Sequence, residues 1–128
     1  MNATVREWRE KAEKDLATAR REMQAVEDPN YDAVCFHTQQ GIEKLMKGLL
    51  ILLGAVPPIL HDLAYLDQLL APLCPEWSWP LEDLRFLTRA AVAFRYPGES
   101  ADREEAAQAL DIATRLRAKL LALFPEGV

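Results

Sequence analysis

The sequence predicts an all-α fold, an antiparallel up-and-down bundle of four long helices and one short helix, in a single domain over residues 1–128. Three observations support this prediction. Apolar residues recur at steps of three and four through every long segment, which is the period of an amphipathic helix. No segment alternates apolar and polar residues with period two, so no strand is expected. The connections are brief and contain Pro or Gly, as in helical bundles.

The first two helices are predicted from the N-terminal half of the chain. The first carries one apolar stripe and ends at "EDPN", because Pro29 disfavours helical backbone in the residue before it. The second runs from about Tyr31 to Leu53 and stops at Gly54, in the manner of a C-cap glycine. The stripe of the first helix consists of Val5, Trp8, Ala12, Leu16, Ala19, Met23 and Val26.

Three further helices follow. A short one begins near Asp62, whose side chain can cap it. Pro80 suits the first turn of a fourth helix, which places Arg95 at the last helical position. The final helix starts near Asp102 with an Asp-x-x-Glu capping box and continues to Phe124.

Composition and charge narrow the class of protein. Half of the residues are hydrophobic and the formal net charge is -5, which argues against disorder and against sequence-independent nucleic-acid binding. The N-terminal stretch lacks the apolar core of a signal peptide, and the longest apolar run is too short to cross a bilayer. We therefore expect a cytoplasmic protein that does not enter membranes. Cys35 and Cys74 lack metal-type spacing and are expected to be free thiols, so neither a metal nor another cofactor is expected.

The second helix carries a second row of side chains, nearly opposite its main stripe. Glu43 and Lys47 in this row form an acid–base pair four residues apart. On an exposed helix such a pair contributes only roughly 0.2–0.5 kcal/mol. This row, however, begins and ends with large apolar residues, so we predict that it forms the subunit interface of a homodimer with polar elements inside it. The row consists of Phe36, Gln40, Glu43, Lys47 and Leu50.

Several polar residues have two interpretations. Asp15 lies beside the apolar stripe of the first helix, so its carboxylate either reaches water or binds an Arg or Tyr of a neighbouring helix. His61 is expected to donate to a backbone carbonyl while Asp62 caps the third helix. His37 is expected to be exposed, and the two histidines are too far apart in sequence to form a metal site.

The stretch "FRYP" ends the fourth helix with Arg95 and Tyr96. A cation there complements the helix dipole by roughly 0.3–1 kcal/mol, which is the purely structural interpretation. A guanidinium beside an aromatic ring also suits a phosphate and a base. We expect Arg95 to be held by a carboxylate, Asp15 or Glu43, and to face a cleft.

Four segments together resemble the HEPN domain, named for higher eukaryotes and prokaryotes and for suspected nucleotide binding. They are "W..KAEKDLATA", "YDAVCFHTQQGIEKLMKGLLILLG", "HDL" and "FRYP", and they extend over essentially the whole chain. The resemblance implies a helical bundle that forms homodimers. Many members are RNases in which four to six residues separate an arginine from a following histidine. Here Ser100, Ala101 and Asp102 occupy the places of that histidine, so the RNase activity is not carried over.

Another branch of the family is more similar, namely small proteins associated with a minimal nucleotidyltransferase in toxin–antitoxin-like systems. This resemblance implies a non-catalytic partner whose cleft binds nucleotide or RNA, lined by Arg95, Tyr96, Glu43 and Lys47, with His61 and Asp62 as further members. Asp15 and Gln40 would support that cleft. Two alternatives stay open. One is a metal-independent RNase that uses His61 or His37 of the second subunit, and the other is a structural dimerisation module without a ligand.

Overall fold

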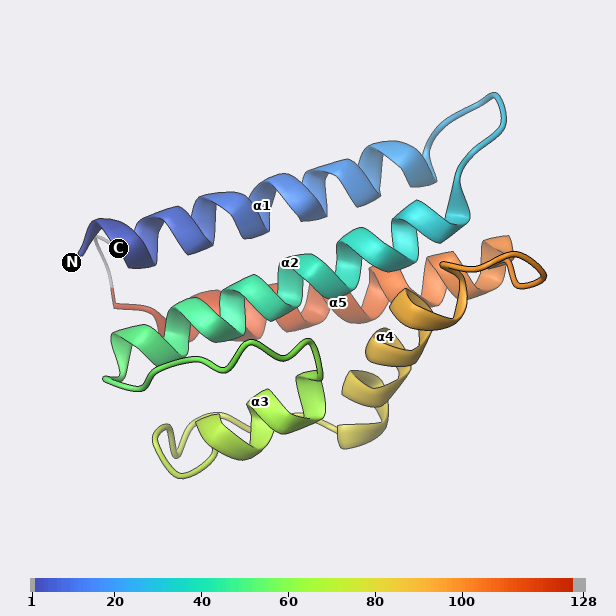
Figure 1. Ribbon diagram of the computed structural model, residues 1–128. Helices are drawn as coiled ribbons and strands as arrows, with labels where there is room; N and C mark the ends of the chain where they lie inside the picture. Colours follow the sequence, from blue (N-terminus) through green and yellow to red (C-terminus); the bar gives the residue numbers. More distant parts are fainter. Residues whose placement is uncertain (1, 126–128) are drawn as a thin grey trace.

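The computed structural model describes residues 2–125, in which five α-helices and no strand occur. The all-α prediction and the order of the helices are confirmed. α1 and α2 form an antiparallel hairpin, and α3 and α4 return the chain so that α5 packs along α2 (Figure 1). The helices are α1 (Ala3–Met23), α2 (Tyr31–Leu52), α3 (Leu63–Leu70), α4 (Leu81–Ala93) and α5 (Arg103–Leu123).

The second helix, α2, is the centre of the fold and contacts each of the other four helices. Its approach to α1 depends on Gly41, where an added Cβ would lie 2.6 Å from Cγ of Leu16. Such a distance is far below van der Waals contact, so only a residue without a side chain fits here. Because α2 is covered on nearly all sides, polar groups on it need partners within the chain.

The helix ends largely follow the capping signals of the sequence. Asp62 accepts a hydrogen bond from the backbone N–H of Ala64 at 3.0 Å, and Asp102 forms the predicted capping box at the start of α5. Two boundaries were predicted wrongly. α1 ends at Met23, so Val26 is 96% exposed and does not belong to the buried stripe. α4 ends at Ala93, which places Arg95 in the turn beyond the helix instead of at its last position.

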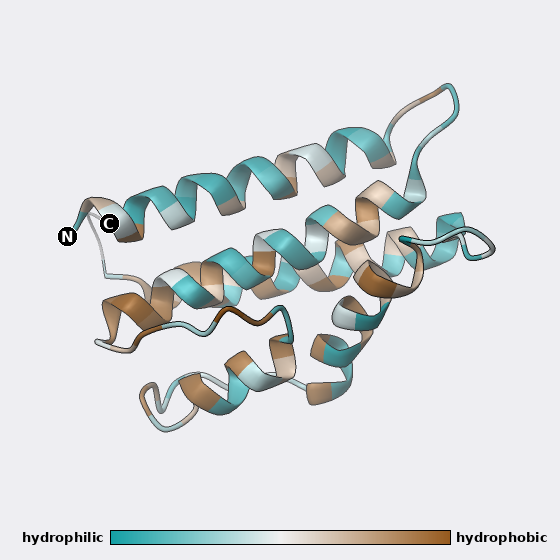
Figure 2. Cartoon of the chain, in the orientation of Figure 1, coloured by the Kyte–Doolittle hydropathy of each residue, from teal (hydrophilic) through white to brown (hydrophobic). Residues whose placement is uncertain are grey.

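The segment 53–62, between α2 and α3, runs back across the surface of α2 (Figure 1). It exposes apolar side chains, with Val56 91% and Ile59 94% exposed and Leu60 half exposed. In Figure 2 this segment has two apolar stretches, separated by a more polar one, beside the mainly polar middle part of α2. No helix of residues 2–125 is long and apolar enough to cross a membrane.

Candidate functional site

A small cavity lies where the C-terminal end of α4 meets the middle of α2 and the end of the segment 53–62. Its volume is about 180 Å³. Three of the predicted site residues meet here, Arg95, Gln40 and His61, and they come from three different parts of the chain. We call this the Arg95 cavity; its lining is Phe36, Gln39, Gln40, His61, Thr88, Ala91, Val92 and Arg95.

Arg95 is exposed and lies against an aromatic ring. Its guanidinium carbon is 5.7 Å from the centroid of Phe36, which is within the range of a cation–π contact. Among residues 2–125 no carboxylate forms a salt bridge with it. The prediction that Asp15 or Glu43 holds Arg95 is therefore wrong. The guanidinium keeps its N–H donors for water or a ligand.

Glu43 is the centre of a buried polar network. It is only 3% exposed, and its carboxylate accepts hydrogen bonds from Nε2 of Gln39 at 3.0 Å and from Nζ of Lys47 at 3.1 Å. Nδ1 of His61 lies 3.0 Å from both carboxylate oxygens. Glu43 and Lys47 thus do not line the cavity; through Gln39 and His61 they fix its wall from behind.

This network corrects the prediction for the second face of α2. Leu50 is fully buried and Lys47 is 6% exposed within a single chain, so no second subunit is needed to cover them. The sequence shows that this face is apolar at both ends. It does not show that α3, α4 and the segment 53–62 fold back over it, because that segment has no helical or strand period.

His61 fastens the segment 53–62 to α2. Its carbonyl oxygen accepts a hydrogen bond from Nε2 of Gln39 at 2.8 Å, and its ring contacts Glu43 although 69% of the side chain is exposed. The prediction that the ring donates to a backbone carbonyl is wrong. Asp62 caps α3 as predicted and does not line the cavity. Tyr96 is 65% exposed and also stays outside the lining.

A second polar cluster joins α1 to α2. Oδ1 of Asp15 lies 2.9 Å from Nδ1 of His37, and Oδ2 accepts from Nζ of Lys44 at 2.5 Å. Asp15 therefore binds a neighbouring helix, but through His and Lys instead of the expected Arg or Tyr. His37, expected to be exposed, has only 29% of its side chain exposed and packs edge-on against Phe36 with 5.3 Å between ring centroids. When Nδ1 carries the proton toward Asp15, Nε2 is left as an acceptor.

The spacing of α2 contained a signal for this cluster. His37 and Lys44 are seven residues apart, so they lie on one side of the helix, and Gly41 lies between them. A glycine inside a helix with polar residues on both sides indicates that another helix approaches closely.

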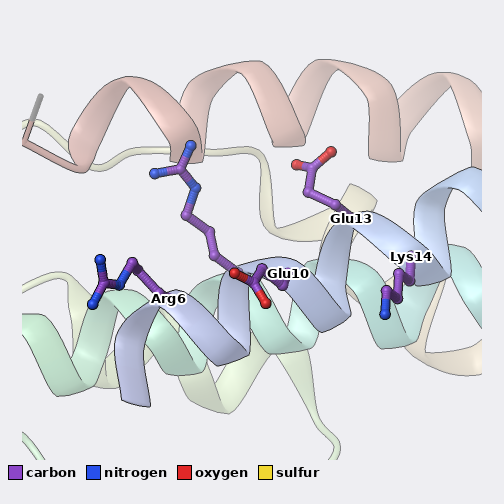
Figure 3. A pocket seen from close by; sticks show the side chains of 5 residues that line it. Arg6, Glu10, Glu13 and Lys14 are labelled. Atoms are coloured by element: carbon purple, nitrogen blue, oxygen red, sulfur yellow. The ribbon is translucent and has the colours of Figure 1, made fainter. Parts of the chain in front are cut away.

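Another hollow, of about 470 Å³, lies elsewhere. Its five lining side chains all come from α1 and include both basic and acidic groups (Figure 3). Glu13 points toward α5 in this view and accepts from Nε of Arg117 at 2.9 and 3.0 Å. This surface is best explained as part of the contact between α1 and α5. Its lining is Arg6, Arg9, Glu10, Glu13 and Lys14.

The thiols do not form a reactive or metal-binding site. Cys35 and Cys74 are buried and free, as expected from the sequence. Burial, with smaller contributions from Glu105, Asp32 and Asp102, raises the pKa of Cys35 to about 12, so the neutral thiol persists at ordinary pH. In residues 2–125 no three side chains of His, Cys, Asp or Glu gather as a metal site would require.

Comparison with known proteins identifies the family. The family model described as "HEPN domain" matches residues 5–123. The chain belongs to the HEPN domain family. Two solved structures are similar to this HEPN chain, and no curated protein matches it.

The first structure is TT1696 from Thermus thermophilus, with 29% identity and a TM-score of 0.76 over 95% of this chain and 98% of that chain. The second is ST0689, an archaeal HEPN homologue, with 24% identity and a TM-score of 0.67 over 95% of this chain and 98% of that chain. At this identity the likeness to ST0689 shows the fold alone.

Within this HEPN chain, two of the three places after Arg95 where RNase members are expected to carry histidine, Ala101 and Asp102, have structural roles. The backbone N–H of Ala101 donates to Oδ1 of Asp32 at 2.6 Å, and Asp102 caps α5. Both contacts fix the turn between α4 and α5. The sequence of residues 95–102 contains no histidine.

Proposed function

We propose that this HEPN protein is a non-catalytic binding subunit that holds the phosphate of a nucleotide at the Arg95 cavity and acts beside a minimal nucleotidyltransferase. The observation that supports binding is the state of Arg95, which lines a cavity and has no carboxylate partner among residues 2–125. A guanidinium without a partner matches the geometry of phosphate oxygens.

The other lining groups suit an anion of this size. Gln40 donates its amide to Oε1 of Gln39 at 2.8 Å, and the hydroxyl of Thr88 accepts from the backbone N–H of Leu63 at 3.2 Å, so both groups are held in place. A volume of about 180 Å³ accommodates a phosphate group but not a whole nucleotide, since pockets for small ligands usually have roughly 300–1,000 Å³. The sugar and base therefore extend out of the Arg95 cavity.

We further propose a homodimer whose interface borders this cavity. The segment 53–62 exposes Val56, Ile59 and Leu60, and Val92 of the cavity wall is half exposed. Together with Tyr96 these residues give exposed apolar surface on the two segments that supply His61 and Arg95 to the cavity, of the kind that a second copy covers. Such a dimer would enclose the bound ligand.

Calorimetric titration of ATP and of a short RNA into wild type and Arg95→Ala tests the binding function. We expect ATP to bind the wild type and its affinity to fall tenfold or more in Arg95→Ala, with each tenfold equal to about 1.4 kcal/mol. Melting of the free protein should barely change, because Arg95 is exposed. Arg85→Ala, which removes an exposed arginine of α4 that does not line the cavity, is the matched control and should bind ATP as the wild type does. A wild type that binds neither probe would overturn the proposal and favour the dimerisation module.

The partner assignment has its own test. A gene for a minimal nucleotidyltransferase beside this one, and co-purification of the two products, would support it. Failure of the two co-expressed proteins to associate would count against it without affecting the ligand site.

A second candidate function, a metal-independent RNase, rests on the Asp15–His37 pair. The ring of His37 and the guanidinium of Arg95 both contact Phe36, at 5.3 and 5.7 Å from its centroid. The distance between the imidazole and the guanidinium is therefore at most the sum of these two distances. In this candidate Nε2 of His37 takes the proton of a ribose 2′-hydroxyl, the 2′-oxygen attacks phosphorus, and the bond from phosphorus to the 5′-oxygen breaks. Water returns a proton to the leaving oxygen, and Arg95 binds the phosphate.

A labelled RNA incubated with EDTA distinguishes this candidate. It predicts a 2′,3′-cyclic phosphate product and a loss of roughly 10²–10⁴-fold in His37→Gln, the usual contribution of general acid–base catalysis. Absence of cleavage by the wild type would exclude it.

A further inference from the structure

A separate cavity of about 450 Å³ lies between α1 and α2, and it shares no lining residue with the Arg95 cavity. Its volume falls within the range of roughly 300–1,000 Å³ that is usual for small-molecule sites. We call it the Trp8 cavity. Its lining is Thr4, Glu7, Trp8 and Lys11 from α1 and Lys44 from α2.

Trp8 differs from the other two tryptophans in its hydrogen bonding. The indole N–H of Trp77 donates to Asp67 at 2.7 Å, and that of Trp79 donates to Asp83 at 3.0 Å. The indole of Trp8 donates to no group of residues 2–125, although the side chain is half buried. Its Cβ lies against Gly48, 3.2 Å from where a Cβ of that residue would be, which fixes the start of the side chain. A positioned indole with a free donor at the wall of a cavity is suited to bind a ring.

The charged groups of the cavity select the kind of ligand. Nζ of Lys44 is held by Asp15 at 2.5 Å and, as an ammonium, has further N–H donors. Lys11 is 62% exposed and lies 3.9 Å from Glu7, which is a weak pair. Two lysines from two helices therefore line the same cavity as the indole. An apolar ligand would desolvate these charges at a cost, whereas a planar ring that carries an anionic group satisfies both kinds of contact.

We propose that the Trp8 cavity is a second ligand subsite, which stacks the planar aromatic ring of an anionic ligand on Trp8 and binds its phosphate through Lys11 and Lys44. The subsite itself rests only on these residues. The choice of a nucleotide as the ligand rests on the proposed function. On α2 the nearest lining residues of the two cavities are Gln40 and Lys44, four residues apart, about 6 Å along the helix axis. The two cavities share no lining residue, so each is proposed to bind its own anionic group.

Tryptophan fluorescence and calorimetry with AMP test the subsite. We expect AMP to quench the fluorescence of the wild type, of Trp79→Phe and of Arg95→Ala, but not of Trp8→Phe. Lys11→Met should weaken AMP binding at the quenched site at least fivefold. Lys14→Met is the matched control, because this exposed lysine of α1 lines a different hollow and should leave the affinity unchanged.

The outcomes separate this proposal from the function of the Arg95 cavity. Quenching that survives Arg95→Ala but disappears in Trp8→Phe supports the subsite even when ATP binding at Arg95 fails. The proposal is overturned when millimolar AMP leaves the wild type unquenched, when quenching persists in Trp8→Phe, or when inorganic phosphate alone quenches equally. Thermal melting shows whether Trp8→Phe is folded. If it is not, Lys11→Met still tests the proposal, because the Lys11 side chain is exposed and its replacement should leave the fold intact. Normal AMP affinity in Lys11→Met then overturns the proposal.

Discussion

Replacing Glu43 alone should destabilise the fold far more than replacing Glu43 and Lys47 together. The two side chains form an ion pair at 3.1 Å with 3% and 6% of their residue surfaces exposed. In Glu43→Leu the Lys47 ammonium stays buried without a counter-charge among the described residues, because Glu43 is its one partner there. In the double variant Glu43→Leu with Lys47→Met, no charge is left to desolvate.

The expected magnitudes follow from these contacts. A charge stranded by removal of its buried partner costs roughly 3–5 kcal/mol. Gln39 also loses one acceptor while keeping the carbonyl of His61, which adds about 1 kcal/mol. Glu43→Leu should therefore cost about 5 kcal/mol, against about 1 kcal/mol or less for the double variant. Lys47→Met should fall between them, since Glu43 keeps Gln39 and His61.

Urea unfolding followed by circular dichroism measures these differences, provided that the slope with denaturant stays constant. The exposed pair Glu7–Lys11, 3.9 Å apart, is the matched control; Glu7→Gln and Lys11→Met should each change stability by less than about 0.5 kcal/mol. A loss below about 1 kcal/mol in Glu43→Leu, or a double variant as unstable as the single one, would refute this reasoning about buried charge.

Three further predictions concern packing, assembly and pH. Gly41→Ala should cost roughly 1–3 kcal/mol in urea unfolding, because its Cβ would lie 2.6 Å from Leu16; unchanged stability would show that α1 shifts freely. Ile59→Glu should lower the mass seen in light scattering without lowering the melting temperature, because Ile59 is 94% exposed; a wild-type monomer at tens of micromolar would exclude the proposed dimer. The neutral thiol of Cys35 should stabilise the fold fully below its ordinary pKa of 9.0, and this stabilisation should be lost as the pH rises toward about 12, at about 1.4 kcal/mol per pH unit. Cys35→Ala should lack this loss. The same slope of the unfolding free energy with pH in both proteins would contradict the prediction.

The fold was readable from the sequence because helical period and capping are local properties. The stripe of α1 and the capping box at Asp102 each lie within a few turns of one helix; the capping box is confirmed, and so is the stripe at Val5, Ala12, Leu16 and Ala19, but not at Val26. The end of α4 was placed two residues too late, because Pro97 sets a limit on the helix without showing that Phe94 already leaves it.

The site was only partly readable, because its contacts join segments far apart in sequence. Spacing showed that Glu43 and Lys47 share a helix face, but burial depends on the segment 53–62 that covers them. Asp15 and His37 are 22 residues apart, and their pairing follows from the close approach of α1 at Gly41. Arg95 and His61 were both named from the sequence, and the structure brings them to one cavity.

The pairing of Asp15 and Glu43, the two carboxylates expected to hold Arg95, explains why Arg95 is available. Asp15 already binds His37 and Lys44, and Glu43 already binds Lys47 and His61. Both carboxylates therefore have partners other than the guanidinium of Arg95. The protein has a formal net charge of -5, yet its acidic groups beside this cavity are neutralised by their own partners. An anion that approaches Arg95 therefore meets little repulsion from them.

We expect that Gln40→Glu will block the anion site, because the new carboxylate will pair with Arg95. Gln40 lines the same cavity as Arg95, so a carboxylate at this position supplies the partner that Arg95 lacks. The side chain of Gln40 is half buried and its one hydrogen bond, to Gln39, contributes about 1 kcal/mol, so the fold should tolerate the change. We expect ATP affinity to fall at least as far as in Arg95→Ala, while the melting temperature moves by only a few degrees. Gln40→Ala, which removes the amide without adding charge, is the control and should weaken ATP binding much less. Undiminished ATP affinity in Gln40→Glu would show that the ligand phosphate is not bound at Arg95.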